Sequence, residues 1–509
     1  MIITVHPQLK CGMMELNACE RKNEMKLAII GGGVAGTHVL KYLMNDKLSR
    51  KMDITVFDDQ KYMGKGRAFQ YEDVELLLNY PANQLSMKRS SPDDFLKWVE
   101  KNRSLEEIQN REGDNTNAEG NIYFSRQLFG HYMKDQFEGH VRKGKVTVVT
   151  NHIRAVKKEG DGYTLHTQED SYKFDYVFMT SGQLYPKDPY QLEGTENYIA
   201  WPYPLYTLDV EPDKDYAIIG AGLSGLDCIR YLHQEGARQV IVASHSGEVQ
   251  SVRGKMVTYK FKYFTGAAFR KVRKKNNDFI PLEKIVELFK QECEHQGIDI
   301  SRFYGVSRRN PLNAMQFDLK NHTAIGALQS AIYQMMWEAP LIWPYMTLED
   351  KERYQQEYAP FIDHYSNPMP EPSAEELTDQ LENNEVVIKA GLKAVEYKYR
   401  KFRLHYEDGT EDRVHYVINA TGPARHLSQT EPDAMIEGLL NDGLIAPHHD
   451  GGIQVLPEDS RIISPKYGVL DNFVALGQMT GGVNFKNNGV HELLLEARRV
   501  VKAFYSRIK

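Results

Sequence analysis

The sequence predicts an α/β fold with two parallel sheets that each carry a glycine-rich turn, and three observations lead to this prediction. The apolar run at 26–30 precedes GGGVAG at 31–36, and the run at 216–219 precedes GAGLSG at 220–225. A third strand-like run, 414–420, ends in Thr421-Gly422-Pro423. Strand, GxGxxG turn and helix in succession form a Rossmann unit, whose glycines permit the tight turn and the approach of a pyrophosphate.

Composition and charge exclude several classes of protein. The chain has 509 residues, of which 41% are hydrophobic and 26% charged, which is ordinary for a folded chain and not for a disordered one. A formal net charge of −6 gives no basic field, so we expect no nucleic-acid partner. No run of about 18 apolar residues occurs, so we expect no membrane span.

The cysteines and histidines predict no metal site. The four cysteines, Cys11, Cys19, Cys228 and Cys293, form no CxxC pair, and no histidines show metal-ligand spacing. The same spacing argues against a dithiol reductase and suits a reducing cytoplasm, which is the predicted location.

Further elements follow from local pattern. Strand-like runs at 145–151, 163–167 and 175–180 predict a meander, and a proline-rich linker follows at 185–204. Charged helical sequence fills 278–296 and 349–358, a buried helix and turn are expected within 323–346, and 367–372 reads as a proline-rich hinge. Strands return at 385–389 and 403–406, and apolar residues at helical spacing predict a last helix over 490–505.

The first turn carries the features of a dinucleotide site. The run 53–58 follows this turn as the expected second strand, and its last residue is Asp58. An acid at the end of that strand can accept hydrogen bonds from an adenosine ribose. The strand after the second turn ends instead in Ser244-His245-Ser246, without a carboxylate. That leaves NADPH or NADH open, with Arg253 or protonated His245 as candidates for a 2′-phosphate.

Two such turns in one chain predict two nucleotides, FAD at the first and a nicotinamide cofactor at the second. The fold is thus two Rossmann-like dinucleotide-binding domains, the FAD domain being discontinuous and the NAD(P)H domain inserted into it. We expect a disordered leader or misassigned start at 1–24, with Met25 as a candidate first residue, the FAD domain at 25–203 and 384–509, and the NAD(P)H-binding and substrate region at 204–383.

Several motifs resemble one family of flavoproteins. GKGRAF at 64–69, LLNYPA at 77–82, PDDFLKW at 92–98, SRQLFGHY at 125–132 and GAGLSGLD at 220–227 resemble segments of the FAD/NAD(P)-binding flavoprotein family that includes FAD-dependent urate hydroxylase and nitrosuccinate-forming aspartate N-monooxygenase. The chain is more distantly similar to flavin-containing and ornithine N-hydroxylating monooxygenases. Two positions depart from the pattern, because the family often has arginines at 244–246 and many flavoproteins have an acid where Gln478 stands.

The resemblance implies an FAD-dependent, NAD(P)H-using oxidoreductase. The leading prediction is a monooxygenase that uses O2 and a flavin C4a-hydroperoxide for N- or C-hydroxylation of a small polar substrate. One alternative is an NAD(P)H:acceptor oxidoreductase without oxygen insertion, and another is a non-catalytic flavin- or nucleotide-binding protein. Oligomeric state and substrate identity stay open.

Site residues follow from the turns and from the resemblance. Asn79 and Asn484 are candidates near the reacting flavin ring, and His491 either tunes the flavin or is a buried structural histidine. The predicted cofactor-binding residues are Gly31, Gly33, Val34, Ala35, Gly36, Asp58, Arg67, Asn79, Thr180, Gly182, Gly220, Gly222, Leu223, Ser224, Gly225, Thr421, Gly422, Gly477 and Gln478.

Overall fold

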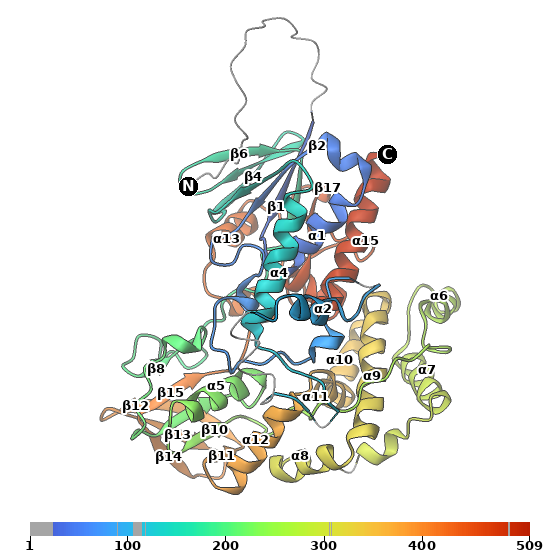
Figure 1. Cartoon of the computed structure of the whole chain (residues 1–509). Helices are drawn as coiled ribbons and strands as arrows, with labels where there is room; N and C mark the ends of the chain where they lie inside the picture. Colours follow the sequence, from blue (N-terminus) through green and yellow to red (C-terminus); the bar gives the residue numbers. More distant parts are fainter. Residues whose placement is uncertain are drawn as a thin grey trace, which may run out of the picture.

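The computed structural model describes residues 24–88, 90–104, 115–117, 119–304, 306, 308–486 and 489–509. The leader predicted at 1–24 lies, apart from Glu24, outside these residues, as do Cys11 and Cys19. Figure 1 shows one sheet-and-helix unit at the top of the view, a second at the lower left, and a group of helices at the lower right.

The upper unit is built on a six-stranded sheet in the order β16-β17-β7-β1-β2-β3. Its strands are β1 (Met25–Ile30), β2 (Met52–Phe57), β3 (Val146–Val149), β7 (Tyr176–Met179), β16 (Arg461–Ser464) and β17 (Gly468–Ala475). All of them pair in parallel except β16 with β17. The inner strands β1, β2 and β7 are buried on both faces along most of their length, as parallel sheets require.

Helices cover one face of this sheet and a small sheet covers the other. Apolar residues of α1 (Val34–Met44) and α15 (Val490–Ile508) pack with those of β1 and β2 in one cluster. The opposite faces of β1 and β7 pack against α13 (Ala434–Asn441) and the antiparallel sheet β4-β5-β6. That sheet comprises β4 (Ala155–Glu159), β5 (Gly162–His166) and β6 (Ser171–Phe174).

The meander predicted from 145 to 180 is therefore wrong in part. Only the central run, β5, belongs to an antiparallel meander, and its partners are β4 and β6. The outer runs, β3 and β7, join the large sheet in parallel with β2 and β1. The periodicity of a sequence run indicates a strand but does not specify which strand it pairs with.

The second unit is a five-stranded parallel sheet in the order β11-β10-β9-β15-β8. Its strands are β8 (Tyr198–Ile199), β9 (Tyr216–Ile219), β10 (Val240–Ala243), β11 (Val386–Lys389) and β15 (Tyr416–Asn419). The helix α5 (Leu223–Gln234) follows β9, and a three-stranded sheet, β12 (Leu392–Lys398), β13 (Lys401–Tyr406) and β14 (Glu411–Val414), packs on the strands.

The domain boundaries predicted at 203/204 and 383/384 cut across this second sheet. It takes β8 from before the first boundary, and β11 and β15 from after the second. The run 414–420, expected to belong to the second part of the FAD domain, pairs with β9 instead. The physical reason is that parallel partners are distant in sequence, so composition shifts and prolines do not mark where the sheet ends.

A helical insertion lies between β10 and β11. It contains α6 (Gly266–Lys275), α7 (Leu282–His295), α8 (Pro311–Lys320), α9 (His322–Glu338), α10 (Leu348–Glu357), α11 (Ala359–Ser366) and α12 (Glu371–Glu382). The helices predicted within 278–296, 323–346 and 349–358 are α7, α9 and α10, and Figure 1 shows α9 and α10 nearer the middle of the molecule and α7 at its right edge. Two helices of the upper unit, α2 (Asp94–Lys101) and α4 (Arg126–Val141), lie toward the middle. Nowhere in the described chain is a helix long and apolar enough to cross a membrane.

Candidate functional site

The first glycine turn is closed so tightly that two of its positions admit only glycine. Gly31 follows β1 with φ at +105°, and a Cβ there would lie 2.2 Å from the carbonyl oxygen of Thr180. A Cβ on Gly36 would lie 2.0 Å from the carbonyl oxygen of Gly31. The turn is therefore packed against the end of β7, where Thr180 and Gly182 were predicted to contact the cofactor.

Asp58 stands beside this turn at the end of β2. The Gly32 N–H donates to its Oδ2 at 2.7 Å, and the Asp59 N–H donates to its Oδ1 at 2.8 Å. Burial raises the pKa of Asp58, while these two hydrogen bonds act in the opposite direction. Each carboxylate oxygen can accept a second hydrogen bond, so the group suits the hydroxyls of a ribose.

The start of α1 is open toward an anion. Gly33 is its N-cap and, having no side chain, leaves the first helical N–H groups without a side-chain acceptor. These N–H groups and the positive end of the helix dipole suit a pyrophosphate, with Val34 and Ala35 in the first turn.

A second loop covers the turn. The Cα of Gly66 would lie 3.1 Å from a Cβ on Gly33, and the sulfur of Met63 would lie 2.5 Å from one on Gly32. The next residue, Arg67, donates from Nη1 to the carbonyl oxygen of Gln183 at 3.2 Å. The predicted GKGRAF segment is thus held against the first turn.

The end of β17 reaches the same turn from another direction. A Cβ on Gly477 would lie 3.8 Å from the Cβ of Ala35, and the Gly477 N–H donates to Glu496 Oε2 at 2.8 Å. The structure therefore brings Gly477 and half-buried Gln478, both predicted cofactor-binding residues, beside the first turn.

Asn484 is buried in a polar network. Its Nδ2 donates to Thr480 Oγ1 at 2.9 Å and to Glu496 Oε1 at 2.8 Å, and its Oδ1 accepts from Arg499 at 3.0 Å. These contacts hold α14 (Gly481–Asn484) against α15. They give the side chain a structural task, and its predicted role near the flavin stays a prediction.

The second glycine turn repeats the backbone geometry with a more open surface. Gly220 has φ at +112°, and a Cβ there would lie 2.6 Å from the carbonyl oxygen of Ala420, at the end of β15. A Cβ on Gly225 would lie 2.2 Å from the carbonyl oxygen of Gly220. In contrast, a Cβ on Gly222 would meet no described atom within 4 Å. Leu223 and Ser224 begin α5 after it, and Thr421 and Gly422 follow β15 beside it.

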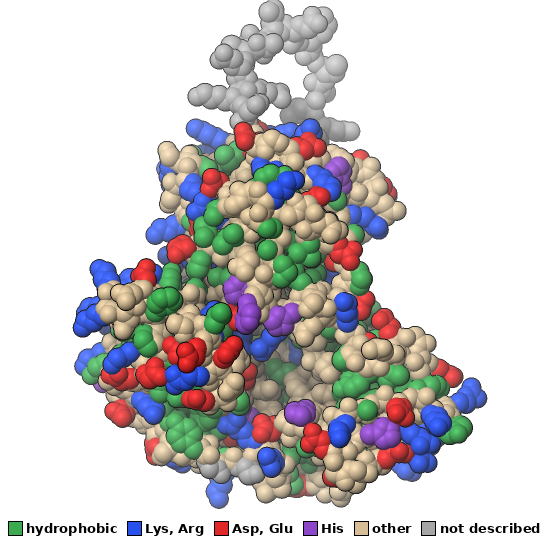
Figure 2. Space-filling model, turned by 180° about the vertical axis from the view of Figure 1, so that it is seen from behind, with side chains coloured by type: hydrophobic (Ala, Val, Ile, Leu, Met, Phe, Trp, Pro, Cys, Tyr) green, Lys and Arg blue, Asp and Glu red, His purple; other side chains and the backbone are tan. Residues whose placement is uncertain are grey.

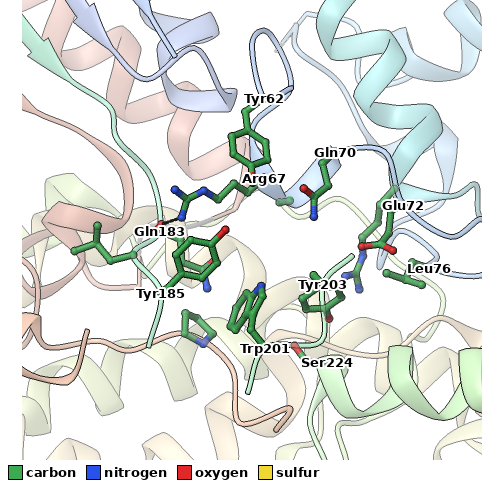
Figure 3. A pocket seen from close by; sticks show the side chains of 14 residues that line it. Tyr62, Arg67, Gln70, Glu72, Leu76, Gln183, Tyr185, Trp201, Tyr203 and Ser224 are labelled. Carbon is green, nitrogen blue, oxygen red and sulfur yellow. Dashed lines mark hydrogen bonds between the residues drawn. The ribbon is translucent and has the colours of Figure 1, made fainter. Parts of the chain in front are cut away.

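A cavity of about 170 Å³ lies between the loop that covers the first turn and the start of α5 at the second turn (Figure 3). At one end Arg67 stacks over the ring of Tyr185, with its guanidinium carbon 4.3 Å from the ring centre, and Tyr62 lies beside them. At the other end lie Glu72 and Tyr203. The full lining is Tyr62, Arg67, Ala68, Gln70, Glu72, Leu76, Arg126, Gln183, Leu184, Tyr185, Trp201, Tyr203, Ser224 and Pro423.

A largely buried ion pair joins the two units at the wall of this cavity. Arg126, at the start of α4, makes contacts of 2.7 and 2.9 Å with the two carboxylate oxygens of Asp227 in α5. The hydroxyl of Tyr203 donates to Asp227 Oδ2 at 2.5 Å. This bidentate pair fixes the orientation of α5, and so of the second turn, relative to the first unit.

Glu72 makes a second connection at the same place. Its Oε1 accepts the backbone N–H groups of Asp73 at 2.9 Å and Leu205 at 2.7 Å. Burial raises the pKa of Glu72 to about 7. Sequence reasoning missed Glu72 and the aromatic lining. Arg126 and Asp227 could have been proposed from the sequence, because Arg126 lies in the SRQLFGHY motif and Asp227 in the GAGLSGLD motif.

Arg253 is not placed where the sequence suggested. It was a candidate for a 2′-phosphate beyond β10, but its guanidinium lies over the ring of Tyr80, 3.8 Å from the ring centre. Its Nε donates to the backbone oxygen of Asn79, and its side chain is 2% exposed. The alternative candidate, His245, is exposed after β10. Among the residues the structure describes, no cluster of three or more metal-ligating side chains occurs.

Comparison with known proteins supports the assignment of the first unit. Residues 28–184 match the family described as FAD-NAD(P)-binding, and no curated protein matches the chain. The chain therefore carries an FAD/NAD(P)-binding domain, as the sequence predicted, and the residues around the first turn fit the nucleotide.

Solved structures share the fold of almost the whole chain. An ornithine hydroxylase from Pseudomonas aeruginosa in its reduced form is 12% identical, with 96% of this chain and 100% of that chain covered at a TM-score of 0.55. An ornithine N-hydroxylase from Kutzneria sp. 744, with reduced FAD, NADP+ and L-ornithine, is also 12% identical, with the same coverage and a TM-score of 0.54. The bacillithiol disulfide reductase of Staphylococcus aureus is 13% identical, with 95% and 99% covered and a TM-score of 0.50. At this identity they confirm the two-domain α/β fold.

Proposed function

We propose that this protein is a flavin-dependent monooxygenase that uses NAD(P)H and O2 to hydroxylate a small polar substrate at nitrogen or carbon. The observation that supports the proposal is the cavity between the two units, because its walls come from both of them and the Arg126–Asp227 pair fixes their relative orientation. FAD, when bound, accepts a hydride from a nicotinamide and passes the electrons to O2. The motif resemblance to urate and aspartate hydroxylases favours oxygen insertion over simple electron transfer.

The chain's own residues bind, orient and exclude water. The start of α1 and Asp58 hold the adenosine diphosphate part of FAD, and Gly66 closes over it. The start of α5 and Gly222 receive the nicotinamide cofactor. The aromatic lining of Tyr62, Tyr185 and Trp201 keeps the space between the two cofactors poor in water, which limits unproductive loss of reducing equivalents.

The test is anaerobic reduction followed by oxygen consumption. The purified protein with FAD is mixed with NADPH or NADH, loss of the flavin absorption is followed, and air is then admitted with small amines, amino acids and urate in turn. A monooxygenase converts NAD(P)H into hydroxylated product, and hydrogen peroxide release per NAD(P)H falls when its substrate is present.

The two alternatives give other outcomes. An acceptor oxidoreductase is reduced by NAD(P)H and passes electrons to an artificial acceptor, while its peroxide yield does not respond to any of these compounds. A non-catalytic nucleotide-binding protein retains flavin that neither nicotinamide reduces. Either result contradicts the monooxygenase proposal.

A further inference from the structure

The most basic stretch of the chain lies in the helical insertion. Residues 249–277 contain nine Lys or Arg side chains and no Asp or Glu, in a chain whose formal net charge is −6. Five of the nine lie in α6, whose sequence is GAAFRKVRKK. Figure 1 shows this helix at the outer right edge of the molecule, and in Figure 2, seen from behind, Lys and Arg side chains gather at the corresponding left edge. A local positive charge therefore stands on the outside of a chain that is acidic as a whole.

One face of α6 is fixed by packing in the protein. Phe269 is buried, and its ring lies edge-to-face with that of Phe264, with 4.8 Å between the ring centres. Both rings belong to an apolar cluster on which Val272 also packs. At the start of the helix, the side chain of Thr265 accepts the N–H of Ala268. The position and orientation of α6 are therefore set from within, and its basic side chains are on the opposite face.

The two arginines of α6 lie beside acids of the same chain. Arg273 pairs with Asp278 at 3.2 Å. Arg270 and Glu338 both approach the start of the helix, since a Cβ on Gly266 would lie 3.4 Å from Nη1 of the arginine and 3.1 Å from Oε2 of the glutamate. The charges of both arginines are therefore partly balanced where they stand.

The three lysines of α6 lack such acids. Lys271, Lys274 and Lys275 are exposed, and none of them forms an ion pair within the part of the chain that the structure describes. Their spacing of i, i+3 and i+4 places them on one face of the helix, where like charges repel one another. Negative charge from outside the molecule relieves this repulsion.

Apolar side chains are exposed at both ends of the same helix. Leu341 is 42% exposed and lies at the start of α6, with its Cδ1 2.9 Å from the Cβ position of Gly266. Phe279 is 50% exposed just after the end of α6, where its N–H donates to the backbone oxygen of Asn276 at 2.9 Å. Lysines flanked by exposed apolar side chains are typical of a helix that lies in a membrane interface.

The exposed side of α6 thus combines positive charge with apolar ends, and we propose that it docks on an anionic phospholipid surface. We call the residues that make this contact the α6 face, and they are Lys271, Lys274, Lys275, Phe279 and Leu341. A membrane supplies both of the partners that this face lacks, namely negative headgroups for the lysines and an apolar layer for the two side chains. A nucleic acid offers its phosphates to the lysines but no apolar layer to the ends. The proposal does not depend on the reaction that the protein catalyses.

Vesicle binding tests the proposal without any turnover. The full chain with FAD is sedimented with vesicles of phosphatidylcholine alone and with vesicles that also contain phosphatidylglycerol, at low and at physiological ionic strength. The protein should bind the anionic vesicles, bind them less well at the higher ionic strength, and stay in solution with phosphatidylcholine alone. The reason is that the lysines reach the headgroups through a charge interaction that salt screens.

Variants of the α6 face separate its charge from its apolar ends. Lys271→Gln/Lys274→Gln/Lys275→Gln should weaken binding to anionic vesicles by about 100-fold, because each basic residue near such a surface contributes about fivefold. What binding remains should depend little on salt. Phe279→Ala removes the exposed ring and should weaken binding by about 10-fold, while the salt dependence stays as in the wild type.

A matched control removes three lysines elsewhere on the surface. Lys393→Gln/Lys398→Gln/Lys401→Gln changes β12 and β13, which Figure 1 shows on the opposite side of the molecule from α6. The net charge changes as much as in the α6 variant, so this control should bind anionic vesicles like the wild type. The flavin content and unfolding midpoint of each variant show whether it is folded.

Three outcomes overturn the proposal. They are an absence of binding of the wild type to anionic vesicles, an equal loss in the control variant, or tighter binding of a DNA duplex or of polyglutamate than of the anionic vesicles. The last result would assign the face to a nucleic acid or to an acidic protein. If the triple variant of α6 does not fold, Phe279→Ala and the salt dependence of the wild type still decide. Failure of NAD(P)H to reduce the flavin contradicts the proposed function and leaves this binding measurement intact.

Discussion

The two glycine turns share one backbone design and differ in what surrounds it. Around the first, Gly66 approaches Gly33, Met63 packs on Gly32, and Asp58 accepts the Gly32 N–H. Around the second, Gly222 faces open space and no acid follows β10. A covered site loses its ligand slowly and an open one exchanges it readily. We therefore expect the first turn to retain FAD through many turnovers and the second to exchange a nicotinamide cofactor in each.

The largest expected effect comes from adding one methyl group to the covered turn. Gly31→Ala places a Cβ 2.2 Å from a backbone oxygen and also needs φ of +105°. Overpacking and backbone strain together cost up to roughly 6 kcal/mol, so this variant should not retain FAD. The measurement is the flavin content of the purified protein and its unfolding midpoint.

The matched change in the open turn should separate the two sites. Gly222→Ala adds the same methyl group where no described atom lies within 4 Å and where φ is −82°, so the fold and the FAD should remain. Only nicotinamide binding should weaken, because the methyl group stands where a pyrophosphate approaches. Loss of FAD from Gly222→Ala, or full retention in Gly31→Ala, would remove the contrast between the turns.

The Arg126–Asp227 pair is expected to couple the two units, both in stability and in hydride transfer between them. Asp227→Asn leaves the largely buried guanidinium of Arg126 without its counter-charge, and the cost should approach the roughly 3–5 kcal/mol of breaking a fully buried pair. Denaturant unfolding measures the loss. The double variant Arg126→Met/Asp227→Leu removes both charges and should recover most of it, while hydride transfer stays slow because the units lose their fixed orientation. A double variant with unchanged hydride transfer would show that the pair serves stability alone.

Features formed by residues close together in the chain were predictable from the sequence, and features formed by distant residues were not. Both turns, Asp58 and the last helix were predictable, because glycine spacing, an acid at a strand end and helical periodicity are local patterns. The sheet partners of β3, β7 and β15 were not, since parallel pairing joins segments far apart in the chain. The same holds for the site between the units. Tyr185 and Trp201 look like linker residues until folding sets them opposite Arg67.

A smaller effect is expected from Glu72, which lies where the two units meet and should make stability depend on pH. Because its pKa is raised to about 7, the folded protein holds a proton that the unfolded chain releases near its ordinary value of 4.5. The free energy of unfolding therefore falls as the pH rises from 4.5 to 7. The shift in pKa corresponds to a total decrease of about 3 kcal/mol. Glu72→Gln keeps an acceptor at Oε1 for Leu205 and should lose this part of the pH dependence. Denaturant unfolding at pH 5 and pH 8 measures it, and an unchanged difference between the two would contradict the assignment.

The smallest expected effect concerns the choice between NADPH and NADH at the open turn. Ser244 follows β10, where an acid would face the 2′ position, and its Oγ accepts the Gly247 N–H at 2.9 Å. Ser244→Asp can keep that hydrogen bond while adding a negative charge, so the KM for NADPH should rise about tenfold relative to that for NADH, equivalent to about 1.4 kcal/mol of repulsion. Ser244→Asn offers the same acceptor without charge and should leave the ratio unchanged. If the two variants behave alike, residue 244 does not face the 2′ position, and specificity at this turn must be sought at His245.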